Sequence, residues 1–414
     1  MLARVRSLVA LASVTLLACS SPRDAAPARE RRPASVSTPT PTPAPTPRAV
    51  AVPGESPGER PTVQASKRTA APAHRCLVRA DQELASGERA LAGYVEGAAI
   101  VVTLEAGGRT LSLWTQAADE TLVRRASLPL EASAQRATLH CAETCELALV
   151  DERARLLAFG VRGERLAAVG VLASGLDRRF APALSQHGRR VLYAYTSAVD
   201  EVMHTWLLVR AQGETTPARD LTPAGHGAAA ASFVLGARPP ILVVIDARAG
   251  VSPLLEIGFD DAAAPKVAQV RTPVSQPYTP PLLQAVQHAS GEVELFYTAI
   301  GKLAMTAVGR VWLRVAKEPT ALLPSRGYGE LTFSVAVGGG TALLALETPT
   351  GSAPTAKRTL ALKLTDGVST HDALTIDAGG EAARPSLASA GAGEYLLAYV
   401  RDGVVHAASL GCAP

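Results

Sequence analysis

The chain has 414 residues, of which 47% are hydrophobic, and this is enough apolar sequence to bury one or two cores and to exclude a wholly disordered protein. The formal net charge of +4 is unevenly spread, because residues 1–75 are strongly basic and residues 76–414 carry about −3. A folded region without a basic excess excludes the broad positive surface that nucleic-acid binding requires.

The beginning of the chain has the pattern of an export signal. Arg4 and Arg6 precede an apolar run, residues 8–18, which is shorter than the about 20 residues needed to span a bilayer. The run ends in Leu16-Leu17-Ala18-Cys19, which resembles the lipobox of bacterial lipoproteins. This resemblance implies a signal peptide over residues 1–18, lipid on Cys19 and a place in the cell envelope, for which we expect the outer membrane. The alternative is an ordinary secretory signal with a chance cysteine.

Residues 19–75 are predicted to be a disordered linker. Twelve of the 30 prolines lie here, including the alternating run Thr38-Pro39-Thr40-Pro41-Thr42-Pro43. Such a segment favours extended polyproline II at about 3.1 Å per residue and cannot build a core. We therefore expect a spacer between the lipid anchor and a folded domain.

Repetition dominates residues 76–414. Segment 84–94 resembles segment 387–399. A similar sequence pattern, a short apolar strand followed by a turn and a second apolar strand, recurs between these two segments. We mark each copy by one anchor residue near the end of its second apolar strand. The anchors lie at intervals averaging about 51 residues and are Tyr94, Val150, Tyr195, Ile245, Tyr297, Leu346 and Tyr399. Strand-built repeats of about 40 to 50 residues resemble the blades of β-propellers. The resemblance predicts an all-β domain, a seven-bladed β-propeller, and the alternative is a pair of β-sandwiches.

Turn residues within the repeats predict hairpins. Residues 395–400 and 404–410 flank Arg401-Asp402-Gly403, and residues 98–105 and 110–116 flank Gly107-Gly108. Asp-Gly and Gly-Gly tolerate the positive φ angles of tight hairpin turns. If the last blade ends near residue 410, residues 76–80 are expected to supply its outer strand and to close the ring.

The cysteines fit an oxidising compartment. Without Cys19, four remain, and two disulfides are predicted, Cys141 with Cys145 and Cys76 with Cys412, the latter joining the two ends of the closed ring. His140 beside Cys141 leaves a metal site as the alternative, although no fourth ligand stands at a recognisable spacing.

Catalytic motifs are scarce. Gly54-Glu55-Ser56-Pro57-Gly58 has the letters of a nucleophile elbow but lies in the proline-rich linker, where no strand and helix can hold the serine. Asp260-Asp261 and His371-Asp372 could form acid and base pairs, yet each lies near a predicted turn. We assign no catalytic residue, no metal and no cofactor.

The predicted binding face is the set of loops that lead into the innermost strands around the central channel. Arginines and aromatic side chains there suit an anionic or sugar-like ligand. The candidate ligand-binding residues are Arg136, Arg179, His226, Tyr278, Tyr328 and Arg384.

The sequence thus predicts a monomeric, lipid-anchored envelope protein that acts as a binding or scaffold module for a protein or glycan, without nucleic acid. The alternative is a propeller enzyme, a hydrolase or lyase acting on an envelope or extracellular glycan.

Overall fold

The computed structural model describes residues 75–413 except 212, 247–251, 275–276, 279, 301–305, 316–319, 328–329, 352, 354, 381 and 392. The predicted signal peptide, Cys19, the linker and the Gly54–Gly58 motif lie outside the described residues. In the part of the chain that is described, every regular element is a β-strand, and no helix has the length and apolar character needed to cross a membrane.

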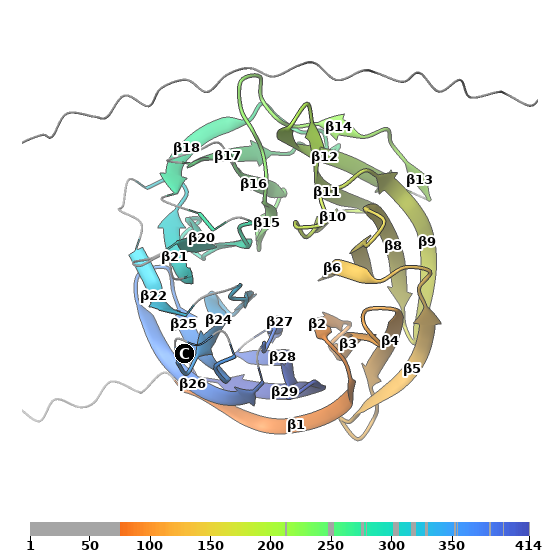
Figure 1. Cartoon of the computed structure of the whole chain (residues 1–414), viewed down its shortest axis with the longest axis vertical. Coiled ribbons are helices and arrows are strands. Elements are labelled where there is room, and N and C mark those ends of the chain that lie inside the picture. Colours follow the sequence, from red (N-terminus) through yellow and green to blue (C-terminus); the bar gives the residue numbers. More distant parts are fainter. Residues whose placement is uncertain are drawn as a thin grey trace, which may run out of the picture. The chain divides into compact units, whose positions relative to one another are not determined.

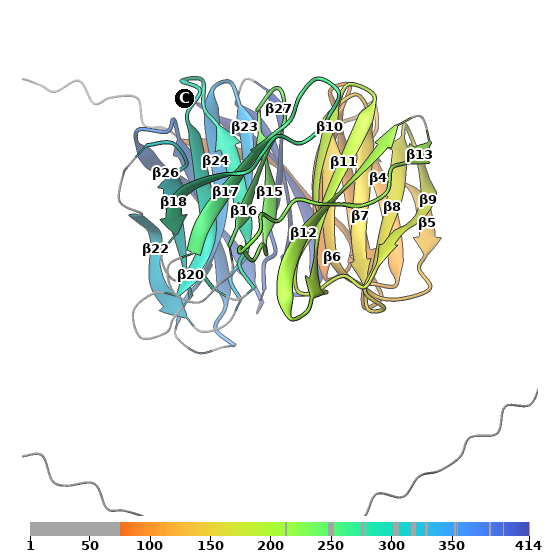
Figure 2. The same cartoon turned by 90° about the horizontal axis from the view of Figure 1, so that it is seen from above.

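The strands form sheets arranged as a ring about a central opening (Figure 1). Six hydrogen-bonded sheets are present among the described residues, and the largest consists of two four-stranded antiparallel halves joined by a parallel pairing of Val234 and Leu235 with Ala285 and Val286. Each sheet, and each half of the largest sheet, is one group of strands. Within a group the strand that begins it lies nearest the opening and the others lie progressively outward (Figure 1), and Figure 2 shows the same strands from the side.

The first three groups contain these strands: β2 (Arg89–Val95), β3 (Ala98–Glu105), β4 (Thr110–Gln116) and β5 (Leu122–Pro129); β6 (Ala134–Cys141), β7 (Cys145–Asp151), β8 (Arg155–Arg162) and β9 (Arg165–Ser174); β10 (Ala183–His187), β11 (Arg190–Val199), β12 (Val202–Ala211), β13 (Glu214–Thr215) and β14 (Arg219–Asp220).

The remaining groups contain these strands: β15 (Ala231–Leu235), β16 (Ile241–Ile245), β17 (Ser252–Gly258) and β18 (Gln269–Val274); β19 (Leu283–Gln287), β20 (Val293–Ile300), β21 (Thr306–Trp312) and β22 (Thr320–Gly327); β23 (Phe333–Gly338), β24 (Thr341–Pro349), β25 (Arg358–Thr365) and β26 (Thr370–Gly379); β27 (Ser386–Gly391), β28 (Glu394–Arg401), β29 (Val404–Cys412) and β1 (Cys76–Ser86).

The ends of the described region join each other. The first strand, β1, pairs antiparallel with the last, β29, and Cys76 lies opposite Cys412 in the register. A disulfide bond links these two residues, as the sequence predicted, and a second links Cys141 to Cys145 across the β6–β7 hairpin. The last group of strands therefore combines both ends of the domain.

The core lies between neighbouring sheets. Val101 of β3, Leu396 of β28 and Val405 of β29, for example, are almost fully buried in one apolar cluster. Central strands such as β3 and β7 are apolar on both faces because a sheet packs on each side of them. This packing fixes the innermost strands, and these position the site described next.

The predicted hairpins are present at their predicted residues. Asp402 and Gly403 both have positive φ, 49° and 80°, in the turn between β28 and β29. One repeat anchor was wrong: Tyr94 lies in the innermost strand β2, whereas the other six anchors lie in the second strands of their groups. The matching second-strand residue is Leu104, which pairs with Arg89.

Candidate functional site

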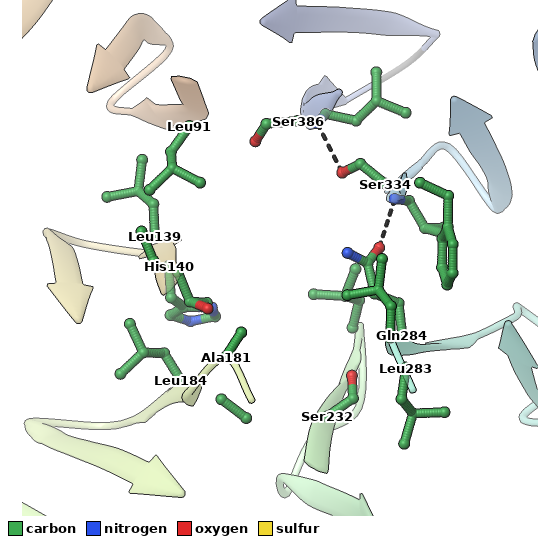
Figure 3. Close-up of a pocket in the computed structure, with 18 of the residues that line it drawn as sticks. Leu91, Leu139, His140, Ala181, Leu184, Ser232, Leu283, Gln284, Ser334 and Ser386 are labelled. Atoms are coloured by element: carbon green, nitrogen blue, oxygen red, sulfur yellow. Dashed lines mark hydrogen bonds between the residues drawn. The ribbon is translucent and has the colours of Figure 1, made fainter. Parts of the chain in front are cut away.

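A cavity of about 610 Å³ occupies the middle of the ring. Its lining comes from the seven innermost strands β2, β6, β10, β15, β19, β23 and β27, the loops that precede them, and Gly236 and Arg238 after β15. Each innermost strand lies beside the next. Figure 3 shows apolar side chains such as Leu91, Leu139 and Leu283 together with the polar side chains of Ser232, Gln284, Ser334 and Ser386. The cavity is therefore of the size and mixed polarity that suits a small organic ligand.

Polar side chains link consecutive innermost strands to one another. Gln284 of β19 accepts a hydrogen bond from Val335 N of β23 at 2.7 Å. Ser334 of β23 in turn accepts one from Leu387 N of β27 at 2.9 Å, and Ser386 of β27 accepts one from Ala92 N of β2 at 3.0 Å. The first two of these bonds are the dashed lines in Figure 3. Edge N–H groups facing the cavity are thereby satisfied by the neighbouring strand.

The side chains that form these links still have hydrogen-bond donors that the links do not use. Each serine hydroxyl uses an oxygen lone pair in the link and keeps its proton, and Gln284 uses only its carbonyl oxygen and keeps its NH2 group. Among the described residues no acceptor takes a hydrogen bond from the hydroxyl of Ser334 or Ser386 or from the amide NH2 of Gln284. The cavity wall thus offers spare hydrogen-bond donors to a ligand.

Three of the six predicted ligand-binding residues line the cavity: Arg136, Arg179 and Arg384. All three lie at or before the start of an innermost strand, and we refer to this end of the cavity as the arginine end. Arg136 donates to the carbonyl of Arg179 at 2.9 Å, and Arg384 donates to the carbonyl of Glu88 at 2.7 Å. Three of the six predicted residues thus lie together at one end of the cavity, and their role in ligand binding stays a prediction.

Each of these three arginines has a carboxylate near it. Arg179 forms a two-pronged pair with Asp177, with the closest approach at 2.6 Å. Arg136 lies 3.4 Å from the carboxylate of Glu330, and Arg384 lies 3.9 Å from that of Glu88. Their charges are thus partly or wholly compensated within the protein.

The sequence interpretation missed two arginines that line the cavity, Arg238, which follows β15, and Arg89 at the arginine end. Arg89, the first residue of β2, lines the cavity and is half-buried. Burial, together with the positive charges of Arg384 and Arg136, lowers the pKa of its guanidinium to about 10, against weaker attraction from Glu330 and Glu88. The side chain remains positively charged at neutral pH. Its position at a strand start is the signal that could have identified it.

Two predicted residues do not line the cavity. His226 lies before β15, where its Nδ1 is 2.8 Å from the buried carboxylate of Asp246. Tyr278 lies before β19, and its backbone N donates to Thr298 O at 2.9 Å. These contacts hold both loops against neighbouring strands of the ring. The third aromatic candidate, Tyr328, lies outside the described residues.

The opposite end of the cavity contains His140, next to the Cys141–Cys145 disulfide. Burial lowers the pKa of His140, so the imidazole is neutral at pH 7. The metal alternative fails at this hairpin because disulfide-bonded sulfur is not a thiolate ligand. Over the described residues, no group of three or more His, Cys, Asp or Glu side chains is placed to hold a metal ion.

The two candidate acid–base pairs lie away from the cavity. Asp260 accepts a hydrogen bond from Ala264 N at 2.8 Å within a surface turn, and Asp372 pairs with Lys363 while remaining largely exposed. Neither pair is among the residues that line the cavity. Both therefore behave as surface charges rather than as a convergent site.

Neither a protein-family profile nor a curated protein sequence matches this chain. Among solved structures, the BP39L lectin from Burkholderia pseudomallei is similar, with a TM-score of 0.58, 12% identity, and coverage of 79% of this chain and 96% of the lectin. A variant of the Aleuria aurantia lectin in complex with Fucα1-6GlcNAc has a TM-score of 0.47 at 11% identity, covering 72% of this chain and 98% of that one. A variant of AofleA from Arthrobotrys oligospora has a TM-score of 0.46 at 12% identity, covering 74% and 91%.

At 12% identity the likeness to the BP39L lectin concerns the fold. It agrees with the all-β arrangement of antiparallel sheets in the described residues. The described part of this chain has the all-β fold of the lectin-like β-propellers.

Proposed function

We propose that this protein is a glycan-binding module that takes its ligand into the central cavity from the arginine end. The observation that carries the proposal is the combination of guanidinium groups and spare hydroxyl and amide donors in one cavity. Sugars present many hydroxyl acceptors, and binding sites satisfy them with a few well-placed polar groups. The fold shared with the BP39L lectin supports this assignment.

The proposal extends to the place of the protein in the cell. The lipobox-like Leu16-Leu17-Ala18-Cys19 supports a lipid anchor on Cys19, and the proline-rich linker supports a domain held away from the membrane. If Cys19 carries the anchor, Cys19→Ala moves the protein from the detergent phase to the aqueous phase on detergent partition. Unchanged retention in the detergent phase would contradict the anchor.

We also propose that the ring has seven blades. The eight-stranded sheet divides naturally at the parallel contact between β15 and β19, because all its other pairings are antiparallel. Counted in this way, each of seven innermost strands begins one blade, and β1 completes the last. An experimental structure with another number of blades would contradict this division.

The binding proposal is tested by filling the cavity. Ala181 is a small cavity-lining residue, so Ala181→Trp should occupy the ligand space and abolish capture of the full-length protein, in detergent, by an array of neutral and acidic oligosaccharides. The matched control is Ala168→Trp on the exposed outer strand β9, which should leave capture unchanged. If wild type binds no glycan, or if Ala181→Trp binds as wild type does, the proposal is wrong.

A further inference from the structure

The arginine end of the cavity contains one uncompensated positive charge. Arg136, Arg179 and Arg384 each have a carboxylate oxygen within 4.0 Å. For Arg89, in contrast, no hydrogen bond or ion pair links the side chain to any residue of the described ranges. Glu88 and Glu330 attract it only from beyond ion-pair distance. Four guanidinium groups thus face three carboxylates.

This arrangement is unfavourable for the empty protein. Burial removes water from the Arg89 guanidinium, and the like charges of Arg384 and Arg136 add repulsion. An arginine cannot relieve this cost by losing its proton at neutral pH, because its pKa is still about 10. Natural proteins rarely leave a buried charge unpaired unless something else supplies the partner.

We propose that the arginine end recognises the carboxylate of an acidic sugar, with Arg89 as its principal partner. The planar guanidinium binds a carboxylate through two parallel hydrogen bonds. An incoming anion supplies the compensation that the protein itself lacks. This inference rests on the proposed glycan-binding function and adds the chemical class of the ligand.

The rest of the cavity favours a sugar over an acidic peptide. Beyond the arginines, the free polar groups of Gln284, Ser334 and Ser386 are donors spread over three adjacent strands. The oxygens of one sugar ring can accept from each of them, and a sugar hydroxyl can rotate its own proton toward water, whereas a peptide N–H has a fixed direction and needs an acceptor there. A uronic acid combines the carboxylate and the hydroxyls in one unit.

The test compares ligands that differ only in charge. The full-length protein in detergent is titrated calorimetrically with trigalacturonate and with the same trisaccharide after reduction of its carboxyl groups. We expect wild type to bind the acidic trisaccharide about 10- to 100-fold more tightly, as one charged hydrogen-bonded pair predicts. Arg89→Met should remove this preference, so that the acidic and the neutral trisaccharide bind to the variant with equal affinity.

A second measurement separates binding from folding. Because Arg89 is uncompensated in the empty protein, Arg89→Met should raise the midpoint of thermal unfolding without ligand and reduce the shift that trigalacturonate produces. A purely structural arginine would give the opposite result, a lower midpoint. The matched control is Arg165→Met on outer strand β9, which removes one exposed charge outside the cavity and should change neither quantity.

Each outcome decides a different point. Equal affinity of wild type for the two trisaccharides, or an undiminished preference in Arg89→Met, overturns the assignment to an acidic sugar while glycan capture on the array still supports the proposed function. Binding of a hexaglutamate peptide as tight as that of trigalacturonate overturns the sugar in favour of an acidic peptide. A failure of the proposed function itself is recognised by the absence of all glycan capture.

Discussion

Arg136 Nη2 and Glu330 Oε1, which lie 194 residues apart in the chain, approach to 3.4 Å at the arginine end of the cavity. Arg136 belongs to β6 and Glu330 precedes β23, and these two strands are not neighbours in the ring. The pair therefore bridges the opening instead of joining adjacent sheets. The Glu330 carboxylate thus lies at the end of the cavity where the proposed acidic ligand would place its carboxylate.

Removing this internal carboxylate should strengthen anion binding. Glu330→Gln keeps the size of the side chain but frees Arg136 and removes one of the attractions on Arg89. We expect the affinity for trigalacturonate to rise by about threefold to tenfold, on the scale of a partly exposed ion pair. Calorimetric titration measures this change, and a weaker affinity would show that Glu330 holds Arg136 in its binding position.

The links between innermost strands are open to a stability test. Ser386→Ala removes the acceptor of Ala92 N, a hydrogen bond of 3.0 Å between the last and first innermost strands. The orphaned N–H should lower the free energy of unfolding by about 1–3 kcal/mol. Denaturant unfolding gives the value, with Ser369→Ala, on an exposed turn, as the comparison. An equal loss in both variants would argue against a special role for the inner link.

Glu347 should make stability fall as pH rises. Burial raises the pKa of this carboxyl, although Thr332 and Arg358 oppose the rise. A raised folded-state pKa means that stability is fully present below the usual value of 4.5 and is lost as pH rises through the folded value. The side chain of the Glu347→Gln variant cannot ionise. Across this pH window the free energy of unfolding of the variant should therefore rise relative to that of wild type by up to about 1.4 kcal/mol per pH unit. Denaturation at a series of pH values checks the sign.

Glu256 should show the opposite pH dependence. Burial again works to raise its pKa, but hydrogen bonds and charges from Arg314 and Arg271 outweigh burial and lower it. The stabilisation of the folded state by the Glu256 carboxylate is therefore present above the usual pKa and is lost as pH falls through the lowered pKa. Glu256→Gln should reduce the free energy of unfolding by about 1–3 kcal/mol at pH 7, and this loss should shrink in acid. A loss that stays constant with pH would contradict the assignment.

The two disulfides should differ in their effect on stability. The Cys76–Cys412 bond spans 336 residues and the Cys141–Cys145 bond spans four. On the chain-entropy model the long loop contributes about 6 kcal/mol and the short one about 2 kcal/mol. The double variant Cys76→Ser with Cys412→Ser should therefore be much less stable in denaturant than Cys141→Ser with Cys145→Ser. Equal losses would place the stabilisation in the folded state rather than in loop closure.

The fold was predictable where local turn chemistry and periodicity agree. Asp402-Gly403 specifies a hairpin because both residues accept positive φ, and the strands on either side appear where they were expected. The closing of the ring by β1 followed from a last repeat that lacked its fourth strand. Both inferences depend on nearby residues or on the simple requirement that every blade has an outer strand.

The site was predictable only in part, for a reason of register. Because Tyr94 was assigned to a second strand rather than to β2, Arg89 stood inside a predicted strand and not at the start of an innermost one. The aromatic candidates His226 and Tyr278 depended on loop paths, which strand periodicity does not encode. The charge pairs of Arg136, Arg179 and Arg384 come from residues before different strands, so only the three-dimensional arrangement identifies Arg89 as uncompensated.

The pairing of β1 with β29 also determines when the domain can become complete. The strand that leads the domain out of the ribosome has no partner until the final strand has followed it, so a chain halted before residue 404 presents β1 as a bare edge. Such an edge invites pairing with another chain. A chain that lacks the nine-residue strand β29 should consequently aggregate, although its other sheets can form, instead of folding into a slightly smaller ring.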